Sequence, residues 1–141
     1  MTNDEIDAFL LQPRDAVLSV ALPKSGRAVG TPVWFVWDNG VARFQSPTTT
    51  AKTRALRATG RASLCVHEQP LPMNRYVTLE GTVREVEFDL EHDIAAAARH
   101  YLGEDAPAFI DKIEQALAAG REWASFELTP SLVSARQQSL L

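Results

Sequence analysis

Residues 31–44, TPVWFVWDNGVARF, constrain the fold more than any other stretch of this chain. Two runs of strand-forming residues are joined there by Asp38-Asn39-Gly40, and an Asn-Gly pair adopts the positive φ angles of a tight hairpin turn. Large apolar side chains occupy both faces of the first run. The stretch therefore predicts a β-hairpin, with Phe35 and Trp37 packing in a barrel core or against a second subunit.

Hydroxyl groups and positive charge follow this hairpin in residues 45–61, QSPTTTAKTRALRATGR. The start of a helix offers unpaired backbone N–H groups, so polar side chains there predict an anion site. The segment alone fits helix capping with solvated cations slightly better than it fits a ligand site. Because the segment follows the aromatic strand, we favour a ligand site over simple capping, with a phosphorylated ring cofactor as the ligand. The candidate residues at this helix start are Ser46, Thr48, Thr49, Thr50, Lys52 and Thr53.

Composition predicts one globular domain, residues 1–141, that can bury about two-thirds of its unfolded surface. No apolar run approaches the ~20 residues that cross a bilayer, and acidic residues stand where a secretory signal needs basic ones. We therefore expect a cytoplasmic protein. The net charge of −4 argues against nucleic-acid binding. Cys65 is the only cysteine, which excludes an internal disulfide, and its apolar neighbours predict a buried structural thiol.

Periodicity and turn residues predict an α+β domain that is mainly β and has the architecture of a barrel. Pro32 is expected to bend the second strand, and Gly81 to mark a bulge or a close backbone approach. Ala51, Ala55, Leu56 and Thr59 are expected to face inward from the helix that ends at Gly60. Strands are expected at residues 16–22, 27–37, 41–45, 62–66, 75–88 and 123–128, helices at 4–11, 90–102 and 107–119, and an exposed proline-containing loop at 68–74.

Four blocks, PVWFVWD, AKTRAL, ASLCV and YVTLEGTV, occur in an order and spacing that resemble the pyridoxamine 5′-phosphate oxidase-like split-barrel family. The resemblance covers roughly residues 9–88 and is closest to the small deazaflavin-dependent reductases. It implies a six-stranded antiparallel split β-barrel with flanking helices. It also implies a homodimer with two cofactor sites at the subunit interface, and FMN or coenzyme F-420 as the redox cofactor.

The resemblance also implies roles for individual residues. Lys52 and Thr53 match residues that bind the cofactor phosphate, and Ser46 matches the end of the strand before them. Val33 and Trp34 match the strand that lies along the tricyclic ring, where the backbone can hydrogen-bond the edge of the ring whatever the side chains do. Arg75 and Tyr76 match a segment that reaches the site of the neighbouring subunit.

Two positions depart from the family pattern. Family members often have arginine where this chain has Thr50, and asparagine where it has Ala55. Loss of the arginine weakens phosphate binding by about 1.5–3 kcal/mol unless another donor replaces it. Arg54, Arg57 or a hydroxyl group are the available replacements, and the choice between the two cofactors stays open at this segment.

The sequence therefore predicts an oxidoreductase in which a bound flavin-type cofactor delivers hydride to a small organic substrate. Solvent or Tyr76 would supply the proton, and no protein residue is identified as catalytic. Two alternatives stay open: a flavin- or haem-binding carrier or sensor without turnover, in which His67 is a candidate haem ligand, and a dimeric scaffold without cofactor. No metal site, nucleic acid or membrane partner is expected.

Overall fold

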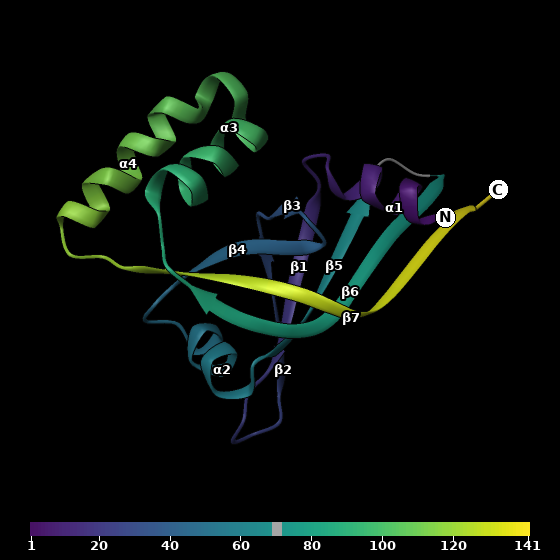
Figure 1. Ribbon diagram of the computed structural model, residues 1–141, viewed down its shortest axis with the longest axis horizontal. Coiled ribbons are helices and arrows are strands. Elements are labelled where there is room, and N and C mark those ends of the chain that lie inside the picture. Colours follow the sequence, from purple (N-terminus) through teal and green to yellow (C-terminus); the bar gives the residue numbers. More distant parts are fainter. Residues whose placement is uncertain (69–71) are drawn as a thin grey trace.

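The computed structural model describes residues 1–68 and 72–141. Within these residues one sheet of seven strands carries four α-helices, a π-helix and a short 3₁₀-helix (Figure 1). The strands are β1 (Asp15–Ala21), β2 (Ala28–Val33), β3 (Val36–Asp38), β4 (Val41–Pro47), β5 (Arg61–Glu68), β6 (Met73–Val86) and β7 (Trp123–Ser139). The helices are α1 (Asn3–Leu10), α2 (Ala51–Thr59), the π-helix η1 (Leu90–Ala95), α3 (Ala96–Leu102), the 3₁₀-helix η2 (Gly103–Asp105) and α4 (Ala106–Ala118).

The expected mainly β, antiparallel architecture with flanking helices is confirmed. The strand order is β2-β1-β5-β6-β7-β4-β3, and each neighbouring pair is antiparallel. The two edge strands, β2 and β3, follow each other in the sequence, which places the two ends of the sheet within one short connection of each other. Closure of the sheet into a barrel stays a prediction.

The number of strands differs from the expected six, because the run over residues 27–37 divides after Val33 and not at Pro32. The side chain of Phe35 enters the core with 2% of its surface exposed. Its backbone N–H and C=O lie 3.4 and 3.5 Å from the hydroxyl of Tyr101. A side chain therefore takes the place of a neighbouring strand at Phe35. Pro32 itself is tolerated because β2 is an edge strand, where a missing N–H breaks no inner ladder.

Two glycines confirm the turn and the bulge expected from the sequence. Asn39 and Gly40 have φ angles of 49° and 76°, as the hairpin between β3 and β4 requires. The register of β6 with β7 shifts between Glu80 and Gly81. A Cβ atom at Gly81 would lie 2.0 Å from the carbonyl oxygen of Thr129, so the two backbones meet too closely for any side chain.

Helix α2 begins and ends where the sequence indicates. Thr50 is its N-cap, with the side chain accepting from the Thr53 N–H at 3.2 Å, and Gly60 ends it in the left-handed conformation. The expectation for its inner face was partly wrong. Ala55 and Leu56 are buried, but Ala51 and Thr59 are exposed, and Thr53 is fully buried in their place.

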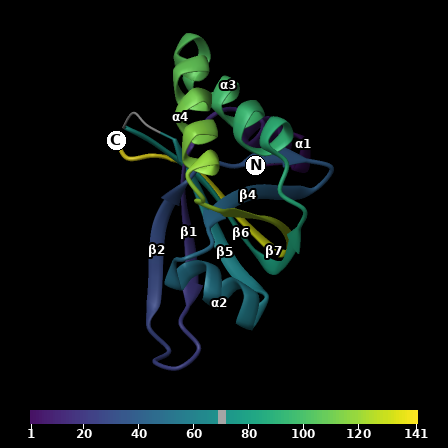
Figure 2. The same cartoon turned by 90° about the vertical axis from the view of Figure 1, so that its left-hand side faces the viewer.

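Helices α3 and α4 are inserted between β6 and β7, and they lie at the end of the molecule opposite α2 (Figures 1 and 2). The expected helix over residues 90–102 begins with the π-helix η1, which brings Asp93 against the sheet. This buried carboxylate accepts from Arg43 Nη2 at 3.1 Å and pairs with Arg43 Nε, and it also accepts from the hydroxyl of Ser125. The ion pair therefore ties the helical insertion to β4 and β7.

Three further expectations need correction. Strand β7 continues to Ser139 and not to residue 128, because its second half pairs with residues 73–82 of β6. Cys65 is half-buried, since it alternates with the fully buried Leu64 and Val66 and faces the other side of the sheet. Glu68 and Met73 are strand ends and not loop residues; the centre of the expected loop, with Pro70, lies outside the described residues.

The core lies between the sheet and helices α1 and α2. Four phenylalanines are fully buried in it, and the Phe44 and Phe126 rings stack at 5.7 Å on the neighbouring strands β4 and β7. In the described part of the chain, no helix combines the length and apolar character that crossing a membrane requires. The largest fully buried side chains are Phe9, Phe35, Phe44, Phe126, Leu10, Leu18, Leu56, Leu64, Leu79, Leu128, Val66 and Val77.

Candidate cofactor cleft

A cleft of about 660 Å³ lies between strands of the sheet and the helical insertion. Its volume is in the range of about 300–1,000 Å³ that holds cofactors and other ligands of that size. One wall comes from β1, β2 and the start of α2, and the opposite wall from η1, α3 and α4. Three residues expected at a cofactor site, Val33, Trp34 and Lys52, line this cleft together, although they come from separate segments of the sequence.

Lys52 brings a positive charge into the cleft from the first turn of α2. Its Nζ donates to the hydroxyl of Thr31 on β2 at 3.1 Å, and no carboxylate pairs with it within residues 1–68 and 72–141. Burial lowers the pKa of the ammonium group, because water is partly removed while no counter-charge replaces it. Lys52 is therefore a desolvated cation whose charge an anionic ligand would balance.

The hydroxyl groups around Lys52 face each other and not the cleft. The Thr53 hydroxyl lies 2.6 Å from Ser46 Oγ and 2.7 Å from the carbonyl oxygen of Pro47, and both Thr53 and Ser46 are completely buried. The Thr50 hydroxyl lies 3.0 Å from Thr53 Oγ1 and 3.1 Å from the same carbonyl. This network fixes the end of β4 to the start of α2 and thereby positions Lys52.

The remaining polar residues of the segment lie at its outer surface. The hydroxyl of Thr48 lies 3.4 Å from the carbonyl oxygen of Glu122, and Thr49 is exposed. Arg54 is exposed too, and its Nη1 donates to the Thr49 carbonyl at 3.0 Å. None of these three lines the cleft, so Lys52 is the one residue among the six candidates at the helix start that reaches it in the described structure.

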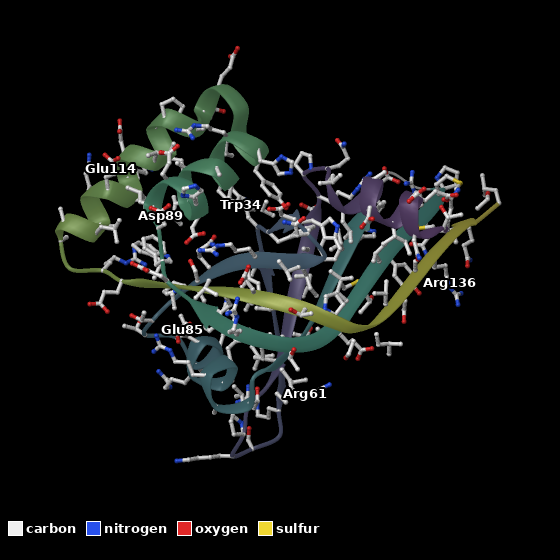
Figure 3. The ribbon with its side chains drawn as sticks, in the orientation of Figure 1. Trp34, Arg61, Glu85, Asp89, Glu114 and Arg136 are labelled. Atoms are coloured by element: carbon white, nitrogen blue, oxygen red, sulfur yellow. The ribbon has the colours of Figure 1, made fainter. Side chains whose placement is uncertain are left out.

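Trp34 lies where the strands and the helical insertion meet (Figure 3). Its ring stacks on Tyr101 at 5.2 Å, with 10° between the planes, and packs on Phe109 at 5.0 Å. The Tyr101 hydroxyl also donates to the carbonyl oxygen of Arg14 at 3.0 Å, next to the first residue of β1. The aromatic contacts therefore hold α3 and α4 over the cleft and leave Trp34 half-buried.

Arg75 and Tyr76 lie outside this cleft. Arg75 Nη1 pairs with Glu68 at 3.2 Å, and Glu68 also pairs with Arg14 at 2.7 Å. The Nε atom of Arg75 is buried and has no hydrogen-bond partner in the described structure. Tyr76 lines a separate hollow of about 340 Å³, with Asp15, Val17, Cys65 and His67.

Sequence reasoning missed most of the cleft wall. Arg14 and Asp15 supply polar groups that no expected motif contained, and Gln45, which begins the segment at residues 45–61, was not among the candidate residues. Phe109 and Ile113 are four residues apart, so they share a face of α4, and this helical spacing was a signal available in the sequence. Ile94 and Ala97 are three residues apart on the expected helix over residues 90–102 and carried the same signal. Trp123 carried none, since it joins the wall only through tertiary packing.

Comparison with protein families gives one match. A family model described as pyridoxamine 5′-phosphate oxidase matches residues 2–135, almost the whole chain. Comparison with curated proteins gives no significant match.

Solved structures show the same fold at low sequence identity. A conserved hypothetical protein from Mycobacterium tuberculosis is 18% identical with a TM-score of 0.77, covering 96% of this chain and 84% of that one. A FAD-binding protein from Mesorhizobium loti is 21% identical with a TM-score of 0.68, covering 99% and 96%. A protein described as an F-420 reductase is 20% identical with a TM-score of 0.61, covering 91% and 94%.

Proposed function

The chain belongs to the pyridoxamine 5′-phosphate oxidase family, and we propose that it is an oxidoreductase that uses a bound flavin or deazaflavin. The observation that carries the proposal is the half-buried Lys52 ammonium, which lacks a carboxylate partner in the described structure and shares a cleft with Val33 and Trp34. Similar structures include proteins described as FAD-binding and as an F-420 reductase, which supports a flavin-type cofactor without choosing among them.

The residues of the cleft suit such a cofactor. Lys52 would hold a phosphate group, because a charged hydrogen bond to phosphate compensates the loss of water around the ammonium. Val33 lies in the edge strand β2, which pairs with β1 on one side only, so its other side offers backbone groups to the edge of a ring. Trp34, held by Tyr101 and Phe109, bounds the ring site.

When bound, the cofactor would supply hydride transfer, and the protein would supply orientation and a partly dry site. Ser46, Thr50 and Thr53 would act indirectly, through the hydroxyl network that positions Lys52. Thr48, Thr49 and Arg54 stay candidates for the outer part of a longer phosphate group, since they lie at the surface of the same helix start.

We also propose a homodimer in which Arg75 and Tyr76 serve the site of the other subunit. Both residues lie outside the cleft of their own chain, and the buried Nε of Arg75 has no partner among residues 1–68 and 72–141, a partner that a second molecule would supply. Light scattering should therefore give a mass near twice the 15.5 kDa of the chain. A monomer at working concentration would refute this part of the proposal.

Equilibrium titration with FMN, FAD and coenzyme F-420 tests the site itself. At least one cofactor should bind, and Lys52→Ala should weaken it by about 1.5–3 kcal/mol, ten- to over a hundredfold. Lys24→Ala, which removes an exposed lysine from the turn after β1, is the matched control and should leave affinity unchanged. Equal affinity in the Lys52 variant would remove Lys52 from the phosphate site.

Turnover distinguishes an enzyme from a carrier. The protein loaded with reduced cofactor should pass hydride to at least one small organic acceptor faster than the free reduced cofactor does. A tight complex that transfers hydride to no acceptor would identify a carrier or sensor instead.

A further inference from the structure

Three charged residues line the cleft, and one of them, Arg14, is already engaged by other groups of the protein. Arg14 pairs with Glu68 at 2.7 Å, its Nε donates to the carbonyl oxygen of Phe9, and its guanidinium covers the Phe9 ring at 4.0 Å. Asp15 adds a carboxylate to the same end of the cleft. Lys52 is therefore the one lining cation that no carboxylate neutralises in the described part of the chain.

Within one chain this single cation limits how many anionic groups the cleft can hold, and the Arg75 that the proposed second subunit would bring is itself engaged by Glu68 at 3.2 Å. If Lys52 binds the phosphate of the cofactor, as proposed above, a second phosphate would meet no free positive charge. It would also meet the carboxylate of Asp15, which lies exposed at the same end of the cleft and repels an anion through water. Pyridoxamine 5′-phosphate, which carries such a group, is therefore a poor fit for the space that remains.

The opposite wall of the cleft shows what would fit instead. Helices η1, α3 and α4 contribute Ile94, Ala97, Phe109 and Ile113, and the start of β7 contributes Trp123. None of these side chains carries a charge, and only the indole N–H of Trp123 is polar. Apolar walls of this kind bind by removing apolar surface from water, which favours flat molecules that have little polar edge.

We propose that this site takes an uncharged, mainly apolar, planar substrate between the bound cofactor and the helical wall, and that it rejects phosphorylated substrates. The inference rests on the proposed function, because it assigns Lys52 to the phosphate of the cofactor. It differs from the activity after which the family is described, and it assigns a role to helices α3 and α4.

The test compares two probes that share one ring system. Protein loaded with the cofactor that binds best is titrated with 2-naphthol and with 2-naphthyl phosphate, and binding is followed by the change in cofactor absorbance. We expect 2-naphthol to bind at least tenfold more tightly. Equal binding, or tighter binding of the phosphate, would overturn the inference, as would micromolar binding of pyridoxamine 5′-phosphate to the loaded protein.

A variant that adds a cation to the helical wall gives a second test. Its expected result is a gain of affinity, which an unfolded protein could not show. Ile113→Arg should raise the affinity for 2-naphthyl phosphate at least tenfold and weaken that for 2-naphthol, since it places a guanidinium on the helical wall. Gln115→Arg adds the same charge on an exposed position of α4 and should change neither affinity. An unaltered preference in the Ile113 variant would show that the ring binds elsewhere, which would contradict the inference.

The first titration separates this inference from the proposed function. If no cofactor binds, the proposed function fails before a substrate is tested. If a cofactor binds and depends on Lys52 but the phosphorylated probe is preferred, only the assignment of the substrate fails.

Discussion

If Lys52 holds the cofactor phosphate as proposed, cofactor binding should depend on pH, because burial lowers the pKa of its ammonium group below the usual value of 10.5. A phosphate binds the protonated form, so affinity should fall as pH rises through this lowered pKa. Lys52→Arg should bind at neutral pH and keep its affinity at alkaline pH, since a guanidinium stays charged. Dissociation constants from pH 7 to pH 10 check this. Parallel profiles for the two proteins would show that Lys52 does not carry the dependence.

Asp93 is a buried charged residue whose loss should damage stability. Desolvation would raise its pKa, but hydrogen bonds from Arg43 and Ser125 outweigh it, so the pKa lies below the usual value of 3.8. Asp93→Asn should lower the free energy of unfolding by about 3 kcal/mol. This is the low end for a broken buried ion pair, because Arg43 keeps 28% of its side chain exposed. Urea unfolding measures this cost, with the exposed Asp111→Asn as control. A cost equal to that of the control would contradict the prediction.

The same ion pair predicts how stability responds to acid. The folded-state pKa of Asp93 is depressed, so its contribution is present above the unfolded value of about 3.9 and is lost as pH falls through the folded pKa. The wild-type protein should therefore lose more stability below pH 4 than Asp93→Asn does. Urea midpoints at pH 3 and pH 7 check this, and equal acid losses would exclude Asp93 as their source.

A residue of the site could be predicted from the sequence where its side chain is unusual for its local position. It could not be predicted where its role depends on distant contacts. Lys52 stands out in the sequence as a cation at a helix start, and the structure brings it into the cleft. Thr53 has the same local signal, but helical periodicity turns its side chain into the core, where its hydroxyl meets Ser46. Arg14 gives no local signal, since its position in the cleft depends on Glu68, which is 54 residues away.

At the scale of elements, Gly81 is required by the crossing of two strands. Gly81→Ala would place a Cβ atom 2.0 Å from a backbone oxygen of β7, and backbone cannot give way as a side chain can. We expect a loss of roughly 3 kcal/mol or more, at or above the upper end for overpacking. Gly30→Ala is the control, because its Cβ atom would contact the movable side chain of Val17 at 3.2 Å. Equal unfolding midpoints for the two variants would refute this account.

Elements with strong local signals were predicted almost to the residue, and those set by distant partners were not. Helix α2 has a threonine cap and a glycine stop, and the β3–β4 hairpin has Asn39-Gly40, so local chemistry fixes their ends. Strand β7 extends to Ser139 because β6 is long enough to pair with it, which no local pattern in its polar second half reveals. Asp93 in the π-helix likewise pairs with the distant Arg43, a contact that no local pattern reveals.

At the scale of the whole molecule, the sheet order explains why the cleft could not be derived from the sequence alone. Periodicity indicates strands but not all of their neighbours: the order β2-β1-β5-β6-β7-β4-β3 places β2 and β3, which follow each other in the sequence, at opposite edges and pairs β1 with β5 and β4 with β7. The order of the four sequence blocks predicted the family, and the family model confirmed it. The helical wall follows from where α3 and α4 are inserted, and the resemblance gave no residue there.

Cofactor binding should also stabilise the whole molecule. A ligand at 100 times its Kd adds about 2.7 kcal/mol to the free energy of unfolding, which raises Tm by roughly 5–10 °C. In Lys52→Ala a tenfold weaker Kd would leave about 1.4 kcal/mol at the same concentration, about half the shift.

The variant without ligand should be no less stable than the wild type, because the substitution removes a desolvated charge that has no carboxylate partner in the described structure. Thermal unfolding with and without cofactor measures both effects. A lowered Tm without ligand together with an unchanged shift would instead make Lys52 a structural residue, with its bond to Thr31 as the cause.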